Sequence, residues 1–113
     1  KRIINKMKLP GNMKSMMKQA EKMKQQMEQL QEKAGEEIIE VSSGGGMVKV
    51  SAKAKGEILS ITIEDEIIES KDKEMMQDLI QAAINESLEK GKLTIKETMN
   101  KAAAAMGIPP GLL

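Results

Sequence analysis

Apolar and polar residues alternate in two runs near the middle of the chain. In residues 48–55 an apolar side chain recurs at every second position and lysine or serine fills the gaps. After Ile58 and Leu59, serine and threonine alternate with isoleucine in residues 60–63. This period of two gives a strand one apolar face, and β-branched residues suit a half-buried strand. Lys55, Gly56 and Glu57 separate the runs, so the pattern predicts a β-hairpin. A lone hairpin is unstable in water, so a third strand, helices or a second chain must cover it.

A third strand is predicted just upstream, at residues 37–41 (EIIEV), which would complete a three-stranded meander. Residues 42–46 (SSGGG) would link it to the hairpin. The three glycines do not form a phosphate-binding loop, because no Gly-Lys-Ser/Thr follows them and no helix is expected to start there. A flexible link into the hairpin is the better interpretation.

A heptad repeat precedes the strands and predicts a long helix from Asn12 to Ala34, ended by Gly35. Such a helix would be about 34 Å long, more than a compact domain with a radius of gyration near 13 Å can cover. Part of it should therefore project or lie against another long helix. The apolar residues of the repeat, spaced alternately by three and four, are Met13, Met16, Ala20, Met23, Met27, Leu30 and Ala34.

A second long helix follows the hairpin and should cover its apolar face. Gly91 costs about 1 kcal/mol relative to alanine inside a helix, yet the apolar spacing continues beyond it, so we expect one helix with a bend at Gly91. Gly107, Pro109 and Pro110 would end it. The apolar stripe before and after Gly91 comprises Met75, Met76, Leu79, Ile80, Ala83, Ile84, Leu88, Ile95, Met99, Ala102 and Met106.

The segment between the hairpin and the second helix is acidic at residues 64–66, where we expect a turn. Ile67 and Ile68 should return to the core. Either Ser70 or Asp72 could cap the following helix, and the sequence does not choose between them. A calcium site at the acidic turn is disfavoured because the spacing of a calcium loop is missing.

Together these elements predict a single α+β domain over residues 1–113, with a small antiparallel three-stranded sheet flanked by long N- and C-terminal helices. We expect residues 1–11 to be loosely ordered and residues 107–113 to form a tail.

Composition excludes much chemistry, because the 113 residues include no Cys, His, Phe, Tyr or Trp. The usual zinc ligands, a thiol nucleophile and an imidazole base are therefore missing, and no cofactor or enzymatic activity is predicted. Without aromatic rings, bases of a single strand have nothing to stack on. No apolar run reaches the roughly 20 residues that span a bilayer, and no export signal is visible, so we predict a cytoplasmic protein without a membrane role.

Basic residues concentrate at the N-terminal end. Residues 1–34 hold nine basic and three acidic residues, whereas residues 35–70 hold three and eight. Lys14, Lys18 and Lys22 stand at intervals of four, on the side of the predicted helix away from the heptad residues. This row suits the phosphates of a polyanion, although charge alone favours a solvated helix face, because lysine-rich helix faces are common. The other lysines that could contribute are Lys24, Lys92, Lys96 and Lys101.

The 11 methionines suggest an alternative function. Thioether side chains adapt to irregular surfaces, so projecting methionine-rich helices could hold a polypeptide client, as in a chaperone-like module. Packing in the core and along the helix seams is the commoner explanation, since nearly all of them lie on apolar stripes.

The chain resembles the YbaB/EbfC family of bacterial nucleoid-associated proteins along nearly its whole length. Each matching motif is weak by itself, but their order and spacing are specific. The matching stretches are residues 16–20 (MMKQA) followed by Met23 and Met27, residues 44–50 (GGGMVKV), residues 72–80 (DKEMMQDLI), residues 82–86 (AAINE) and residues 108–111 (IPPG).

The resemblance implies a homodimer that grips double-stranded DNA between projecting helices like tweezers, and serves DNA compaction or regulation at the nucleoid without catalysis. It places the DNA contacts on the N- and C-terminal helices, which here carry Lys14, Lys18, Lys22 and Lys24, and Lys92, Lys96 and Lys101. It also implies that sheets and central helices meet across the dimer. We assign that interface to Val48, Val50, Ile61, Ile63, Leu79, Ile80 and Ala83. A preferred DNA sequence, further assembly of dimers and a protein partner in replication or repair are left open.

Overall fold

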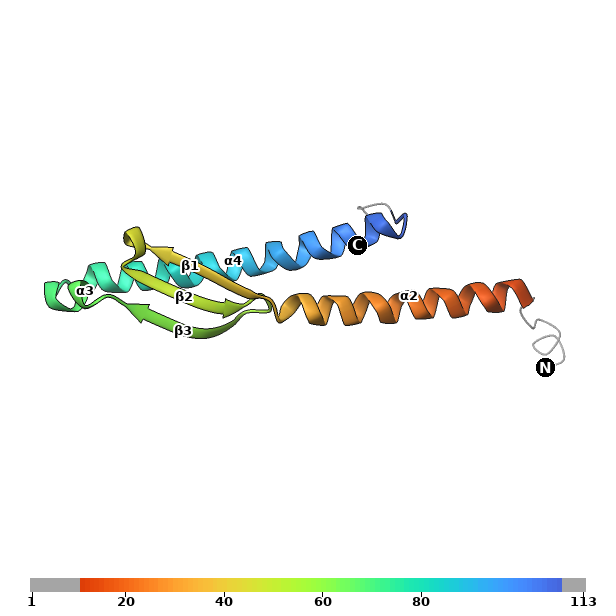
Figure 1. The fold of residues 1–113 in the computed structure, drawn as a ribbon, viewed down its shortest axis with the longest axis horizontal. Helices are drawn as coiled ribbons and strands as arrows, with labels where there is room; N and C mark the ends of the chain where they lie inside the picture. The colour runs from red at the N-terminus through yellow and green to blue at the C-terminus, as the bar shows by residue number, and fades with distance from the viewer. Residues whose placement is uncertain (1–10, 109–113) are drawn as a thin grey trace.

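The computed structural model describes residues 11–108. The molecule is elongated, with extents of 79 × 30 × 19 Å and a radius of gyration of 22.7 Å, well above the roughly 13 Å of a compact domain of this size. Figure 1 shows the cause: a small sheet and its covering helix form one end, and a long helix projects from the other. The predicted loose segment 1–11, apart from Gly11, and the predicted tail 107–113, apart from Gly107 and Ile108, lie outside the described residues.

The sheet has the predicted meander topology. Strands β1 (Ile38–Ser43), β2 (Val48–Lys53) and β3 (Glu57–Ile63) lie in that order, and both pairs are antiparallel. The first strand begins one residue later and ends two residues later than predicted, so the link to β2 consists of the three glycines and Met47. The glycines form the 3₁₀ turn η1 (Gly44–Gly46), in which all three have positive φ, a conformation that glycine adopts without strain.

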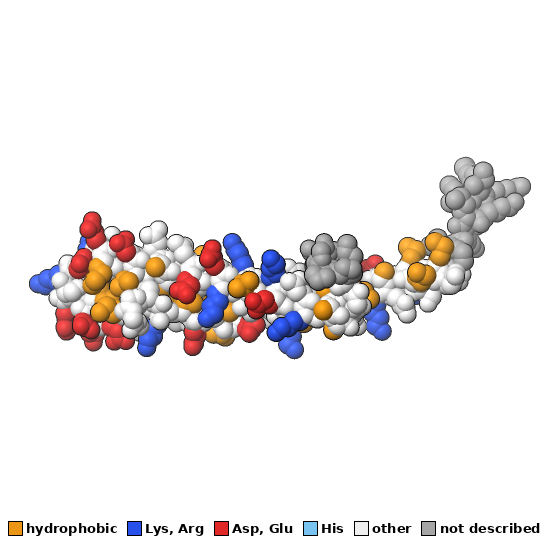
Figure 2. Space-filling model, turned by 90° about the horizontal axis from the view of Figure 1, so that it is seen from above, with side chains coloured by type: hydrophobic (Ala, Val, Ile, Leu, Met, Phe, Trp, Pro, Cys, Tyr) orange, Lys and Arg blue, Asp and Glu red, His pale blue; other side chains and the backbone are white. Residues whose placement is uncertain are grey.

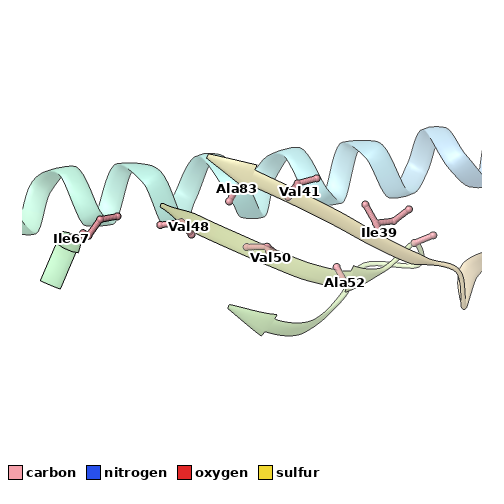
Figure 3. Packing of buried hydrophobic residues seen from close by; sticks show 8 residues of the cluster. Ile39, Val41, Val48, Val50, Ala52, Ile67 and Ala83 are labelled. Atoms are coloured by element: carbon pink, nitrogen blue, oxygen red, sulfur yellow. The ribbon is translucent and has the colours of Figure 1, made fainter. Parts of the chain in front are cut away.

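Helix α4 (Lys73–Ala105) packs against β1 and β2, as the apolar stripe predicted, and the core lies between them. Figure 3 shows the side chains of this core between the strands and the helix. Small residues of α4 let the sheet approach closely, because Ala83, Ser87 and Gly91 are buried at successive turns. The buried apolar residues of the core are Ile39, Val41, Val48, Val50, Ala52, Ala54, Ile67 and Ala83.

The strand β3 shares this apolar face but lies beyond the cover of the helix. Ile61 pairs with Val50 and so points to the same side of the sheet. The side chain of Val50 is 2% exposed, whereas that of Ile61 is 42% exposed. One chain therefore covers only two of its three strands.

The acidic segment differs from its predicted form, because it is the short helix α3 (Asp65–Ser70) rather than a turn. Ile67 is 1% exposed and belongs to the core, as predicted, but Ile68 is 57% exposed and the prediction for it was wrong. Neighbouring residues of a helix point about 100° apart, so the two cannot share one buried face. Asp72 caps α4, since its Oδ1 accepts a hydrogen bond from the backbone N–H of Met75 at 3.0 Å.

Helix α2 (Gly11–Gly35) carries the predicted heptad and lies antiparallel to the C-terminal part of α4 (Figure 1). We call Met27, Leu30 and Ala34 the inner seam and Met13, Met16, Ala20 and Met23 the outer seam. The inner seam lies on the half of α2 that contacts α4 and is buried or half-buried. The outer seam is exposed throughout. The prediction that part of the helix projects is confirmed.

Candidate nucleic-acid interface

The lysine row of α2 consists of Lys14, Lys18 and Lys22, and all three side chains are exposed. Residues four apart in a helix lie on one side, because four steps of about 100° nearly complete a turn. The row lies roughly opposite Ala20, which is two residues from both Lys18 and Lys22. Since α4 contacts α2 along the seam on the other side, the row faces away from the rest of the chain.

Lys24 does not belong to this row. It follows Lys22 by two residues and is therefore turned by about 200° around the helix axis, onto the seam side of α2. Its side chain is exposed as well. A surface that engages the row would leave Lys24 at the other side of the helix.

The lysines of α4 also divide into two positions. Lys92 and Lys96 share one side of the helix, where they line a shallow depression together with Lys90, the exposed Leu93 and two acidic residues, Glu86 and Glu89. Lys101 lies five residues beyond Lys96 and so about 140° around the axis. All three predicted lysines are exposed, but only Lys92 and Lys96 form a common surface.

Acidic side chains gather at the opposite end of the molecule from the projecting helix. Figure 2 shows them around α3 and the start of α4. Residues 64–78 contain seven carboxylates and only two lysines, Lys71 and Lys73. Residues 11–24 contain four lysines and a single glutamate. The described chain is thus charged with opposite signs at its two ends, and a polyanion would be attracted to the helical end. The seven are Glu64, Asp65, Glu66, Glu69, Asp72, Glu74 and Asp78.

Salt bridges and a backbone hydrogen bond connect the C-terminal end of α2 to the hairpin of β2 and β3. The carboxylate of Glu36 lies 2.8 Å from Lys53 Nζ and 3.1 Å from Lys55 Nζ, and Lys53 also approaches Glu57 at 3.4 Å. The pKa of Glu36 is lowered, mainly by the hydrogen bond from Lys53 and next by the one from Lys55. The pKa of Lys53 is raised, mainly by the hydrogen bond that it donates to Glu36. The backbone N–H of Lys55 donates to the carbonyl of Gly35 at 2.9 Å. These contacts hold the projecting helix relative to the sheet, and they neutralise two lysines within the chain.

The predicted interface residues occupy different places. Val48, Val50 and Ala83 lie in the chain's own core, where sheet and helix cover them without a second chain. The side chain of Leu79 lies against η1, within 3.0 Å of where a Cβ on Gly44 would stand. Ile61, Ile63 and Ile80 are exposed or half-buried.

Sequence reasoning missed the apolar residues that lie beside these three. Ile58 of β3 pairs with Ala52, as the predicted Ile63 pairs with Val48, so both share the helix-facing side of the sheet. On α4 a row of half-buried side chains at intervals of four residues runs along one flank, and its last member, Leu88, approaches the turn before β3 at Gly56. We call these two sets the β3 flank. Its members are Ile58, Ile61, Ile63, Met76, Ile80, Ile84 and Leu88.

Within residues 11–108, no group of three or more Asp or Glu side chains is placed to hold a metal ion. Nor does any helix in that range have the length and apolar character needed to cross a membrane.

The fold and the charged helices define a class of protein: a small α+β domain whose basic helix projects from a three-stranded sheet. Over residues 7–106 the chain matches the model of the YbaB/EbfC DNA-binding family. The chain therefore belongs to this family, as its sequence motifs indicated.

Similar proteins agree with this assignment. A "Nucleoid-associated protein" of Pelotomaculum thermopropionicum is 46% identical over 99 residues, covering 88% of this chain and 94% of the relative. One of Acetivibrio thermocellus is 42% identical over 102 residues, covering 90% of each. The crystal structure of an uncharacterized protein from Helicobacter pylori has a TM-score of 0.60 at 30% identity, covering 88% of this chain and 98% of that one.

Proposed function

We propose that this chain binds double-stranded DNA as a homodimer at the nucleoid, in the cytoplasm, through contacts between lysines and phosphates. The observation that carries the proposal is the exposed row of Lys14, Lys18 and Lys22 on a helix that projects from the domain, away from its acidic end. The names of the relatives from Pelotomaculum thermopropionicum and Acetivibrio thermocellus support the nucleoid as its place of action. The role is one of binding rather than catalysis.

The mode of binding follows from the kind of cation present. Lysine is a compact point charge that attracts phosphates without reading bases. The chain has a single arginine, Arg2, and arginine is the side chain that most often recognises guanine by two hydrogen bonds. We therefore expect DNA of any sequence to bind, with Lys92 and Lys96 adding a second contact surface to the row on α2.

The homodimer is supported by the β3 flank. Its side chains continue the apolar core beyond the edge of α4, and Ile61 at its centre is 42% exposed. Strand β3 is also an edge strand, so its outer backbone groups are available for pairing with another strand. An identical flank, turned by a twofold axis, would cover this one, because such an interface brings the same surface of both subunits together.

The proposed DNA contact is tested by reversing the charge of the row. In the variant with Lys14, Lys18 and Lys22 all replaced by glutamate, we expect affinity for a fluorescent duplex to fall by about a hundredfold or more at low salt. The matched control replaces Lys49, Lys71 and Lys73 by glutamate, which changes the net charge equally but at exposed sites near the acidic end. Equal losses in the two variants would refute the assignment to α2, because net charge alone would then explain the effect.

A further inference from the structure

The outer seam of α2 is a continuation of a surface that is already used for helix packing. On the inner seam Ala34 is 6% exposed, whereas on the outer seam Met16 is 65% exposed. The two halves belong to one heptad repeat and differ because α4 ends at Ala105, alongside the middle of α2 (Figure 1). Apolar residues at heptad spacing pack against a second helix. Within this chain, α4 packs against the inner seam and leaves the outer seam without such a helix.

We propose that the outer seam pairs with the outer seam of a second copy of this chain, in antiparallel orientation, with the two helices crossing at Ala20. The spacing of the seam supplies the reason. Counted from Ala20, the outer seam places methionines four and seven residues before it and one methionine three residues after it, and the half-buried Met27, where the inner seam begins, follows seven residues after it. The pattern reads nearly the same in both directions, which is what a self-complementary twofold contact requires.

The side chains at the crossing fit this geometry. Alanine is small, so the two backbones approach closely at Ala20, and Met16 of each helix then meets Met23 of the other. Methionine is unbranched and fills such irregular contacts well. The lysine row lies on the far side of α2 and stays exposed in the pair, so the contact competes neither with phosphates nor with the β3 flank at the other end of the molecule.

The pairing of the helices and the binding of DNA should depend on salt in opposite ways. Residues 11–24 carry four lysines and one glutamate, so two paired helices repel each other through charges that salt screens. Salt should therefore strengthen the pairing, whereas it weakens contacts between lysine and phosphate. The pairing requires no DNA and stands even if the proposed DNA contact fails. In a dimer joined at the β3 flank, it would link one dimer to the next.

The chain contains no cysteine, which makes a direct test available on the full protein. The variant Ala20→Cys places one thiol at the proposed crossing, and Lys22→Cys places one on the opposite side of the same helix turn. Disulfides form only when the two Cα atoms come within about 7 Å. With diamide as oxidant and without DNA, we expect Ala20→Cys to cross-link at least about tenfold faster than Lys22→Cys.

Two further measurements make the test decisive. Raising the salt from about 50 to about 500 mM should accelerate cross-linking of Ala20→Cys, and adding Met16→Glu to this variant should slow it to the rate of the control. Both positions are exposed, and circular dichroism checks that helix content is unchanged. Equal rates for the two cysteine variants, or a Met16→Glu addition without effect, would overturn the proposal.

Discussion

Gly91 of α4 lies directly against the backbone of Ala54, the residue that follows β2. A Cβ placed on Gly91 would stand 3.0 Å from both the Cα and the carbonyl carbon of Ala54, and closer still to the carbonyl oxygen. Real Cβ atoms do not approach backbone this closely, and the backbone of Ala54 is itself held by a hydrogen bond from its N–H to the carbonyl of Glu37 at 2.8 Å. The helix therefore reaches the sheet at this point only because residue 91 has no side chain.

The first prediction concerns this contact. Gly91→Ala should lower the free energy of unfolding by about 1 to 3 kcal/mol, as overpacking does, although alanine alone favours a helix by about 1 kcal/mol. Urea unfolding followed by circular dichroism measures the change. Gly11→Ala is the control, because nothing lies within 4 Å of its Cβ position, and it should change stability by less than about 0.5 kcal/mol. A stabilised Gly91→Ala variant would contradict the close approach.

A second prediction follows from the ion pairs at the base of α2. Because the folded state lowers the pKa of Glu36, its carboxylate stabilises the fold above the ordinary carboxyl value of 4.5 and this contribution is lost as pH falls through the lowered pKa. Glu36→Gln should therefore lower the Tm at neutral pH, and the difference from the parent protein should vanish in acid.

Thermal unfolding at several pH values between about 7 and 3 measures this difference. Glu40→Gln serves as the control, since no ion pair of Glu40 is found within the described range 11–108. A difference for Glu36→Gln that stays constant down to the lowest pH would show that the charge of Glu36 is not its source.

A third prediction addresses the β3 flank. Ile61→Lys places a charge at the centre of the proposed interface and should shift the protein from dimer to monomer, because a buried unpaired charge is costly. Ile38→Lys is the matched control: Ile38 is 52% exposed, on β1 at the other edge of the sheet. Sedimentation equilibrium gives the mass of both variants. A dimeric Ile61→Lys variant would place the interface elsewhere.

Much of this fold could be predicted because its elements follow simple periods. The two-residue period of apolar positions predicted the hairpin. The heptad repeat predicted α2, and its length predicted that part of this helix projects from the domain. The short helix α3 was missed, since six residues hold too little repeat to distinguish a helix from a turn. Gly91 appeared only as a cost to helix stability, because its use depends on a contact with Ala54, 37 positions earlier in the sequence.

The candidate sites show a different limit. All seven predicted lysines are exposed. However, Lys24 and Lys101 lie at other angles around their helices and so do not share a surface with the neighbouring predicted lysines. Alternation also shows that Val48 and Val50 face something apolar without showing which chain provides it. Here α4 of the same chain covers them, and Ile61 on the next strand is left outside. Only the packing of α4 on two strands out of three reveals the β3 flank.

The most direct test of the proposed function is the affinity of the unmodified protein for a duplex of arbitrary sequence, measured at several salt concentrations. About six phosphates neutralised by the two lysine rows of a dimer predict a slope near −5 in a plot of log affinity against log salt. Duplexes of different sequence should give nearly the same slope and affinity. Affinity that does not change with salt, or that depends on one particular sequence, would contradict binding through lysine and phosphate.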